Sequence, residues 1–278
     1  MFNLIVDSAY FSFYDNNKVS KSKFELDSNF FCLKNISFEV KEGEFIGILG
    51  PNGSGKTTLM KLIAGILSPQ KGKILLNNKN LKEYKAKELA RIISYTPQRP
   101  FSVFPFSVYE IVLMGRYPYM NFLGYETEED RKIVLEILDV MEISNVKNKS
   151  INEISGGEAQ RAFIGRALAQ NPKLLILDES NSHLDIKHQL QIFDLIEKLN
   201  KEKKIAVIAV LHDLNLAGHY AKRIIFLKDG KIIIDQNARD ALTQKNIYDI
   251  FGVDSYVYFD KAFNKTYVTV KPFPLCKA

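Results

Sequence analysis

A glycine-rich segment that ends in lysine and threonine is the first candidate for chemistry. Residues 50–58 read GPNGSGKTT and fit the pattern G-x-x-x-x-G-K-[ST] at every fixed position. In such a loop, backbone N–H groups bind phosphates, the lysine reaches the β- and γ-phosphates, and the hydroxyl binds Mg²⁺. A strand-like segment precedes it and a helix-like segment follows, which disfavours a chance glycine turn. The predicted phosphate loop comprises Gly50, Pro51, Asn52, Gly53, Ser54, Gly55, Lys56, Thr57 and Thr58.

Two adjacent carboxylates follow the aliphatic run 174–177. A carboxylate at the carboxyl end of a strand lies where open α/β sheets bind ligands. Asp178 is therefore predicted to hold Mg²⁺, directly or through water, and Glu179 to polarise an attacking water as a general base. The alternative, an acidic turn without catalytic function, is disfavoured by the phosphate loop upstream.

A second potential anion site lies about a hundred residues after the first. Residues 154–161 read ISGGEAQR, with Ser155, Gly156 and Gly157 at the start of a helix-like segment. The first turn of a helix offers free N–H groups and the positive end of the helix dipole to an anion. Ser155 is also an ordinary helix cap, so this motif is weak by itself.

The segments around these motifs predict an α/β protein. The continuous aliphatic runs in 44–50, 173–179 and 204–213 are typical of strands in a covered parallel sheet. The first 40 residues predict three strands, at about 2–6, 9–14 and 35–40, with a long polar loop at 15–29.

Helical patterns occupy most of the remaining chain. Thr127 and Asp130 form a capping-box-like pair before an amphipathic helix, so the middle of the chain predicts an inserted helical block. Further helices are predicted at 57–67, 186–199 and 240–251, and a hairpin at 255–278.

Composition indicates an ordinary soluble protein. The 278 residues are 46% hydrophobic and 25% charged, and the net charge of +6 most simply reflects a solvated basic face. The longest apolar run has seven residues, where a membrane-spanning helix needs about 20. No signal peptide is predicted. Cys32 and Cys276 lack metal-ligand or redox spacing, which favours reduced thiols in the cytoplasm.

Taken together, the motifs resemble those of the ATP-binding-cassette (ABC) ATPases along nearly the whole chain. Residues 50–58 resemble the family's Walker A motif, 154–158 its signature, 178–179 its Walker B motif and 182–185 its D-loop. The resemblance implies an α/β P-loop NTPase core with a mostly parallel sheet, an N-terminal antiparallel β-subdomain and an inserted α-helical subdomain. We expect one ABC domain over 1–278, with the core in 1–97 and 170–230, the helical subdomain in 98–169 and an extension in 231–278.

The resemblance also assigns roles that the residues alone do not. Gln98 resembles the Q-loop glutamine, which contacts Mg²⁺ or the attacking water, and His212 the switch histidine, which contacts the γ-phosphate. Asp185 resembles the D-loop aspartate. Tyr14 resembles the aromatic that stacks on adenine. The alternative is that the nearby aromatics Tyr10 or Phe13 are neighbours in the core instead.

Two motifs depart from the family's pattern. Ser180 and Asn181 replace the usual Pro-Thr, and Glu158 replaces the signature glutamine. Glu158 lies one residue inside the helix, where its side chain can point away from the phosphate, so we expect activity to survive. These changes put the rate in doubt more than the mechanism.

The resemblance explains why one chain carries two phosphate sites. In that family two chains dimerise head to tail, and each ATP lies between the phosphate loop of one chain and the signature helix of the other. This chain is then expected to be a homodimer that binds ATP and Mg²⁺.

Residues 104–124 resemble the permease-contacting region of ATPases from iron–siderophore, haem and cobalamin importers. The implied partners are membrane permease subunits and, indirectly, an extracytoplasmic binding protein, with the ATPase peripheral on the cytoplasmic side of the membrane. The alternatives are a soluble ABC ATPase that acts on nucleic acid or ribosomes, and the ATPase of another transporter class. The 99 residues from Lys56 to Ser155 hold one compact helical insert and no coiled coil, which disfavours the former.

Overall fold

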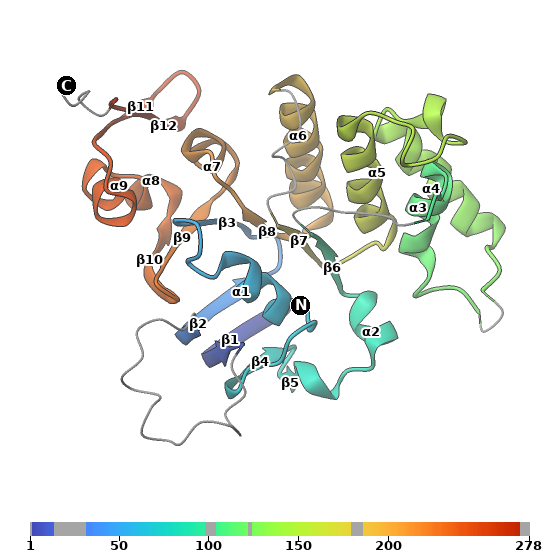
Figure 1. Cartoon of the computed structure of the whole chain (residues 1–278), viewed down its shortest axis with the longest axis horizontal. Helices are drawn as coiled ribbons and strands as arrows, with labels where there is room; N and C mark the ends of the chain where they lie inside the picture. Colours follow the sequence, from blue (N-terminus) through green and yellow to red (C-terminus); the bar gives the residue numbers. More distant parts are fainter. Residues whose placement is uncertain (1, 14–31, 98–103, 122–123, 179–185, 273–278) are drawn as a thin grey trace. The chain divides into compact units, whose positions relative to one another are not determined.

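The computed structural model describes residues 2–13, 32–97, 104–121, 124–178 and 186–272, and the chain divides into two compact units (Figure 1). The first unit comprises 1–41, 45–82 and 210–278, and the second comprises 42–44 and 83–209. Within the described ranges, every helix is too short or too polar to cross a lipid bilayer.

The first unit contains an antiparallel sheet with the strand order β2-β1-β4-β5. Alternate side chains such as Leu4 and Val6 are buried, so one face of the sheet packs on the core. The prediction of two strands before residue 15 is wrong, because a single strand runs through both segments. Ser8 takes a φ of 51°, and the pairing with β2 shifts register there and resumes at Ala9. The strands are β1 (Asn3–Ser12), β2 (Cys32–Lys41), β4 (Lys71–Leu76) and β5 (Lys79–Asn80).

The same unit holds the strand that leads into the phosphate loop. β3 (Phe45–Leu49) is buried at every residue and pairs in parallel with β9 (Arg223–Lys228), which pairs antiparallel with β10 (Lys231–Asn237). Helix α1 (Lys56–Ile63) follows the loop and is shorter than the predicted 57–67. Helix α7 (Leu214–Tyr220) and the short 3₁₀ turn η2 (Leu81–Glu83) complete this part.

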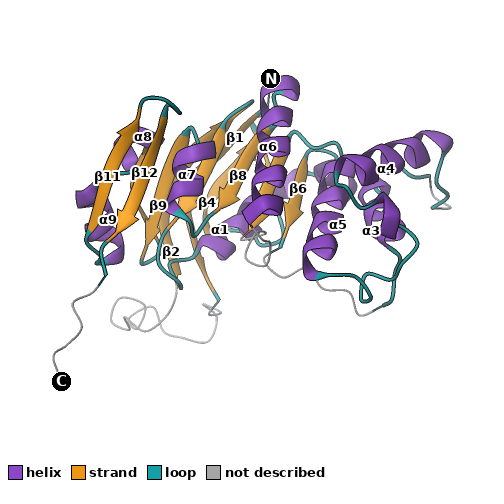
Figure 2. Cartoon of the chain, turned by 90° about the horizontal axis from the view of Figure 1, so that it is seen from above, coloured by secondary structure: helices purple, strands orange, loops and turns teal. Residues whose placement is uncertain are grey.

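The C-terminal part of the first unit is a pair of short helices followed by a hairpin. The single helix predicted for 240–251 is wrong: the chain leaves helical geometry at Leu242, and Thr243 caps a new helix by accepting a hydrogen bond from Asn246 N. The helices are α8 (Ala238–Ala241) and α9 (Gln244–Phe251). The predicted hairpin is confirmed as β11 (Ser255–Asp260) paired with β12 (Lys265–Val270) (Figure 2).

The second unit contains the strand that ends in Asp178. β7 (Leu174–Asp178) lies between β8 (Ala206–Val210) and β6 (Ile93–Thr96), and β6 and β7 are parallel. β7 and β8 are buried throughout, as their aliphatic sequences predict. Helix α6 (Ile186–Lys203) extends four residues beyond the predicted end, and α2 (Ala86–Ala90) precedes β6.

The predicted helical block is confirmed in this unit. It comprises α3 (Val108–Leu113), η3 (Met114–Arg116), α4 (Glu128–Val140), η4 (Ser144–Val146) and α5 (Gly156–Ala169). Thr127 and Asp130 form the expected capping box at the start of α4. Its apolar face buries Val134 and Leu138. Arg116 in η3 donates hydrogen bonds to the Asp130 carboxylate in α4 and to the Ala169 carbonyl at the end of α5. These bonds connect three elements.

Candidate nucleotide-binding site

The phosphate loop begins at a position that only glycine fits. Gly50 follows β3 with a φ of 153°, and a Cβ there would lie 2.0 Å from the carbonyl oxygen of Leu227. A side chain would therefore push the loop away from β9. The turn between β9 and β10 also contacts the loop, because Gly230 N donates to the Ser54 carbonyl oxygen at 3.2 Å. The sheet thus fixes the shape of the loop before any ligand is bound.

Lys56 is the first residue of α1, and its ammonium group folds back over the loop. The side chain is buried, and Nζ donates to the carbonyl oxygens of Gly50 at 2.9 Å and Pro51 at 3.0 Å. A positive charge is thus held against the loop at the start of a helix, and a positive charge beside a helix start favours the binding of a polyphosphate. Thr57 follows on α1, half-buried beside it.

Ser54 supplies an observation that bears on whether a phosphate fits. Its hydroxyl oxygen is buried and has no hydrogen-bond partner within the part of the chain that the structure describes. Buried hydroxyls are normally hydrogen-bonded. A phosphate oxygen in the loop offers the missing acceptor, so the loop fits the group that its sequence predicts.

His212 lies in the same unit as the phosphate loop, and the residue before it contacts strand β3. Leu211 N donates to the carbonyl oxygen of Ile48 at 3.1 Å, two residues before the loop begins at Gly50. His212 itself is exposed and directly precedes Asp213, the N-cap of α7. The residue before His212 is thus bonded to the strand that leads into the loop, and the γ-phosphate contact stays a prediction.

Asp178 lies in the second unit at the end of β7. Its side chain is fully buried, and the Tyr95 hydroxyl donates to its Oδ2 at 3.0 Å. Burial of the tyrosine, and then the negative charge of Asp178, raise the pKa of Tyr95, so the tyrosine remains a proton donor to the carboxylate. Sequence reasoning missed Tyr95, because this contact depends on the pairing of β6 with β7.

The signature segment starts helix α5 as predicted. Ser155 is the N-cap, and its hydroxyl oxygen accepts from Glu158 N. Ser155 and Gly156 are exposed, and a Cβ at Gly156 would meet no atom within 4 Å. The start of this helix is therefore exposed and can be reached by another molecule.

The Glu158 side chain folds back onto the N-cap of its own helix. Its Oε2 accepts hydrogen bonds from Ser155 N at 2.9 Å and Ser155 Oγ at 2.7 Å, which completes a capping box. The bonds from the Ser155 hydroxyl and N–H lower the pKa of Glu158, so a carboxylate is held at the tip of the helix. The substitution of glutamine by glutamate thus places a negative charge beside the signature serine.

Several predicted site residues lie outside the described residues. They are Tyr14, Gln98, Glu179 and Asp185, together with the substituted pair Ser180 and Asn181. The two competitors of Tyr14 are described: Tyr10 and Phe13 are 37% and 65% exposed. The alternative that they pack in the core is therefore wrong.

The proposed Mg²⁺ ligands have suitable chemistry. Thr57 offers a hydroxyl, Asp178 a carboxylate and Gln98 an amide oxygen, and Mg²⁺ prefers such oxygen donors. Asp178 is buried and accepts a hydrogen bond from Tyr95, so its carboxylate is fixed in orientation as a metal ligand must be. Each of these side chains thus offers the type of donor atom that the ion prefers.

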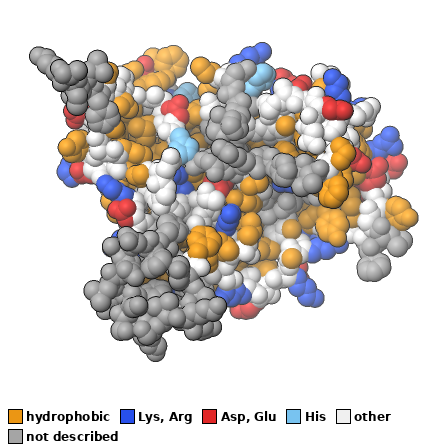
Figure 3. All heavy atoms as spheres, viewed as in Figure 1, with side chains coloured by type: hydrophobic (Ala, Val, Ile, Leu, Met, Phe, Trp, Pro, Cys, Tyr) orange, Lys and Arg blue, Asp and Glu red, His pale blue; other side chains and the backbone are white. Residues whose placement is uncertain are grey.

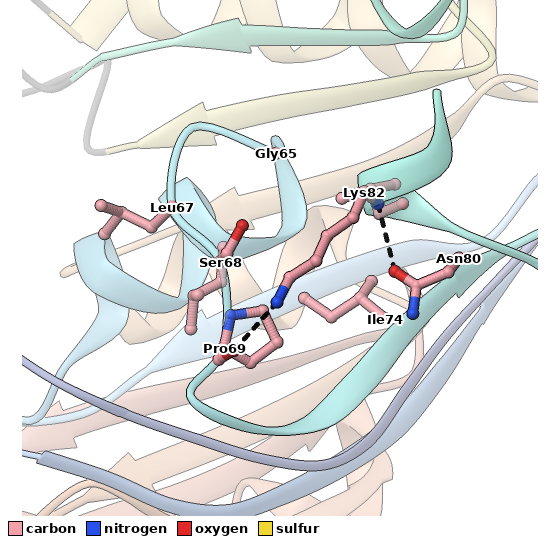
Figure 4. Close-up of a pocket in the computed structure, with 9 residues that line it drawn as sticks. Gly65, Leu67, Ser68, Pro69, Ile74, Asn80 and Lys82 are labelled. Carbon is pink, nitrogen blue, oxygen red and sulfur yellow. Dashed lines mark hydrogen bonds between the residues drawn. The ribbon is translucent and has the colours of Figure 1, made fainter. Parts of the chain in front are cut away.

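A separate small hollow lies at the far end of α1 (Figure 4). Leu67, Ile74 and Lys82 are among its lining residues, and the Lys82 amine donates to the Pro69 carbonyl at 3.4 Å. The residues described as lining it include none from the phosphate loop. We assign it no part in nucleotide binding.

Comparison with protein families and curated sequences identifies relatives of the chain. The model of the ABC transporter family matches residues 33–182. The hemin import ATP-binding protein HmuV of Escherichia coli O157:H7 is 38% identical over 234 residues, covering 82% of this chain and 89% of that protein. The uncharacterized ABC transporter ATP-binding protein YvrA of Bacillus subtilis is 39% identical over 241 residues. The alignment with YvrA covers 86% of this chain but only 54% of YvrA, about half its length.

Solved structures give the same result for the fold. An ABC transporter assigned to the metal-chelate type, in an inward-facing conformation, matches with a TM-score of 0.79 and 25% identity, and 99% of each chain is covered. A dimeric ATP-binding cassette, MJ0796, bound to ADP and phosphate matches with a TM-score of 0.72 and 31% identity, covering 85% of this chain and 99% of that one. The predicted P-loop NTPase fold is thereby confirmed.

Proposed function

Because the chain belongs to the ABC transporter family, we propose that it is the ATP-binding and ATP-hydrolysing subunit of an importer. The proposed cargo is an iron chelate, haem or cobalamin, which passes through a separate membrane permease. One observation carries this proposal: a complete phosphate loop with a buried lysine and an open, capped helix start occur in the same chain.

The two phosphate sites are complementary halves of a shared site in a homodimer. Lys56 and the loop amides of one copy bind the β- and γ-phosphates of ATP. Ser155 and the first amides of α5 in the partner copy bind the γ-phosphate from the opposite side. The exposure of Ser155 and Gly156 is compatible with this arrangement, because a second copy can reach this helix start from outside.

Hydrolysis requires a water molecule oriented toward the γ-phosphate. Glu179 accepts a proton from this water as the general base, and His212 contacts the γ-phosphate from the strand edge beside the loop. Thr57, Gln98 and Asp178 hold Mg²⁺, which neutralises charge on the β- and γ-phosphates when bound. The Tyr95 hydrogen bond keeps the Asp178 carboxylate in one orientation.

ATP drives the two copies together because only the closed dimer satisfies both halves of each site. Hydrolysis removes the γ-phosphate contacts, and the affinity that favoured the closed form is lost. The dimer then opens. The closing and opening of the dimer is the movement that the ATPase transmits to its permease.

The surface proposed to receive the permease is the segment 104–124 with the Gln98 loop. Two of its aromatic side chains are exposed: Phe104 is 65% and Tyr117 is 70% exposed. Orange hydrophobic side chains are visible over the helical block in Figure 3. Exposed aromatics of this kind are typical of protein interfaces. The ATPase then lies on the cytoplasmic side of the membrane as a peripheral subunit, with an extracytoplasmic binding protein as an indirect partner and no nucleic acid.

Co-purification tests this function. The chain, expressed with a candidate permease, should co-purify with it in detergent. Tyr117→Ala should weaken the complex without changing hydrolysis by the isolated chain. Tyr248→Ala is the matched control, since Tyr248 is 57% exposed but lies in α9. Recovery of bound RNA or ribosomes instead of a permease would favour the non-transport alternative.

The cargo is tested in the reconstituted complex. A binding protein loaded with a ferric siderophore, haemin, cobalamin or molybdate is added to the complex in proteoliposomes, and phosphate release is measured. We expect the largest stimulation with an iron chelate, in keeping with the names of relatives such as the hemin import protein. Stimulation by molybdate alone would contradict the proposed cargo class but not the ATPase.

A further inference from the structure

The C-terminal hairpin is bonded to α7 through one side chain. Val268 N donates to Asn215 Oδ1 at 2.7 Å, and Asn215 Nδ2 donates to the Val268 carbonyl oxygen at 3.2 Å. The side-chain amide therefore pairs with β12 as the backbone of a neighbouring strand would. Both N–H and C=O of Val268 are used by Asn215.

Contacts continue along the helix beyond Asn215. A Cβ at Gly218 would lie 2.4 Å from the carbonyl oxygen of Thr266, so glycine is required for β12 to approach the helix this closely. The Lys265 amine donates to the His219 carbonyl at the end of α7. β12 lies beside α7 in both ribbon views (Figures 1 and 2).

The same asparagine is bonded to the cap that follows His212. Asp213 is the N-cap of α7, and its Oδ1 accepts from Asn215 N at 2.7 Å and Leu216 N at 3.3 Å. On the other side of His212, Leu211 N is bonded to β3. His212 thus lies between a residue fixed to the sheet and a helix start whose second residue is fixed to β12.

We propose that Asn215 is a positioning residue for His212, and that the C-terminal hairpin acts through it by holding the first turn of α7. This inference rests on the proposed contact of His212 with the γ-phosphate. It assigns a function to the extension: the hairpin sets the place of a side chain that touches the nucleotide.

The first test compares two asparagines in the full-length chain. Asn215→Ala removes both bonds to Val268. Asn246→Ala is the matched control, because Asn246 Nδ2 donates to the carbonyl oxygens of Ala241 at 2.9 Å and Asp240 at 3.4 Å but holds the start of α9. We expect Asn215→Ala to lower kcat for ATP by about tenfold with KM changed less than about twofold, and Asn246→Ala to leave kcat within about twofold.

A second variant reaches the contact from the hairpin. Val268→Pro deletes the N–H that Asn215 accepts. It should lower kcat as Asn215→Ala does. The double variant Asn215→Ala with Val268→Pro should be no slower than the slower single variant, because both substitutions break the same contact. The imidazole NMR signal of His212 should shift in both variants and stay in place in Asn246→Ala.

His212→Ala separates failure of this inference from failure of the proposed function. If His212→Ala hydrolyses ATP at the normal rate, the γ-phosphate role is wrong and the positioning role falls with it. If His212→Ala is slow while Asn215→Ala and Val268→Pro keep normal kcat, the proposed function stands and the positioning role is refuted. Equal losses of kcat in Asn215→Ala and Asn246→Ala would likewise refute it, because the effect would then follow stability alone.

Discussion

Replacement of Arg116 by methionine should destabilise the helical block more than any surface change. The Arg116 and Asp130 side chains are 7% and 5% exposed, and Nε lies 2.8 Å from Oδ1. Removing one partner of such a buried pair costs about 3–5 kcal/mol, because the other charge stays buried without its counterion. Arg116 also donates to the Ala169 carbonyl and lies 4.0 Å above the Tyr119 ring, so its loss loosens the end of α5 as well.

The assay is urea unfolding followed by circular dichroism for a double-mutant cycle. Arg116→Met, Asp130→Asn and the double variant are compared with the parent chain at neutral pH. Asp130→Asn keeps a side chain that can accept from Thr127 N, but it leaves the buried Arg116 without its counterion and should also cost about 3–5 kcal/mol. The double variant should cost clearly less than the sum of the two, with a coupling of about 2 kcal/mol.

A partly exposed ion pair in the same helical block is the control for the effect of burial. Arg161 in α5 pairs with Glu142 at 3.7 Å, but the Glu142 side chain is 62% exposed. Glu142→Gln should therefore cost less than about 1 kcal/mol. An Arg116→Met variant that lost no more stability than Glu142→Gln, or a fully additive cycle, would refute the reasoning.

Three further results are expected. Glu179→Gln should still bind ATP and accumulate as an ATP-bound dimer on gel filtration, while hydrolysis falls by about 100-fold or more; undiminished phosphate release would exclude Glu179 as the base. Burial raises the pKa of Asp130, but the hydrogen bonds from Arg116 and Thr127 outweigh it and lower the pKa below the ordinary 3.8. The stability from this carboxylate is therefore present above about pH 3.8 and is lost as the pH falls through the lower pKa of the folded state. The free energies of unfolding of the parent chain and Asp130→Asn should then approach each other in acid. A difference between them that stays constant across this range would contradict the lowered pKa. Gly50→Ala should lose ATP binding while keeping its circular dichroism spectrum, because its Cβ meets the Leu227 carbonyl; unchanged affinity for a fluorescent ATP analogue would show that the loop tolerates the methyl group.

Much of the site could be predicted because its chemistry is local in sequence. The glycine spacing of residues 50–58 and the serine before two glycines specify a loop and a helix start by themselves. The aliphatic runs around β3, β7 and β8 predict buried parallel strands for the same reason.

Other features depend on contacts between distant segments. The hydrogen bond from Tyr95 to Asp178 requires β6 to pair with β7 in the register that places Tyr95 opposite Ile176. The fold-back of Glu158 onto Ser155 is a choice between side-chain rotamers that the sequence alone leaves open. The roles of Tyr14, Gln98, Glu179 and Asp185 stay predictions.

Mixing two inactive variants tests the shared site most directly. Lys56→Met disables the phosphate loop, and Ser155→Arg blocks the signature helix start while leaving ATP binding by the single chain intact. If each ATP lies between two copies, a dimer of one variant with the other contains one intact site. An equal mixture should then recover about a quarter of the parent rate, because half of the dimers are mixed and each has one working site of two. A mixture as inactive as either variant alone would mean that each chain hydrolyses ATP with its own residues, and would contradict the account.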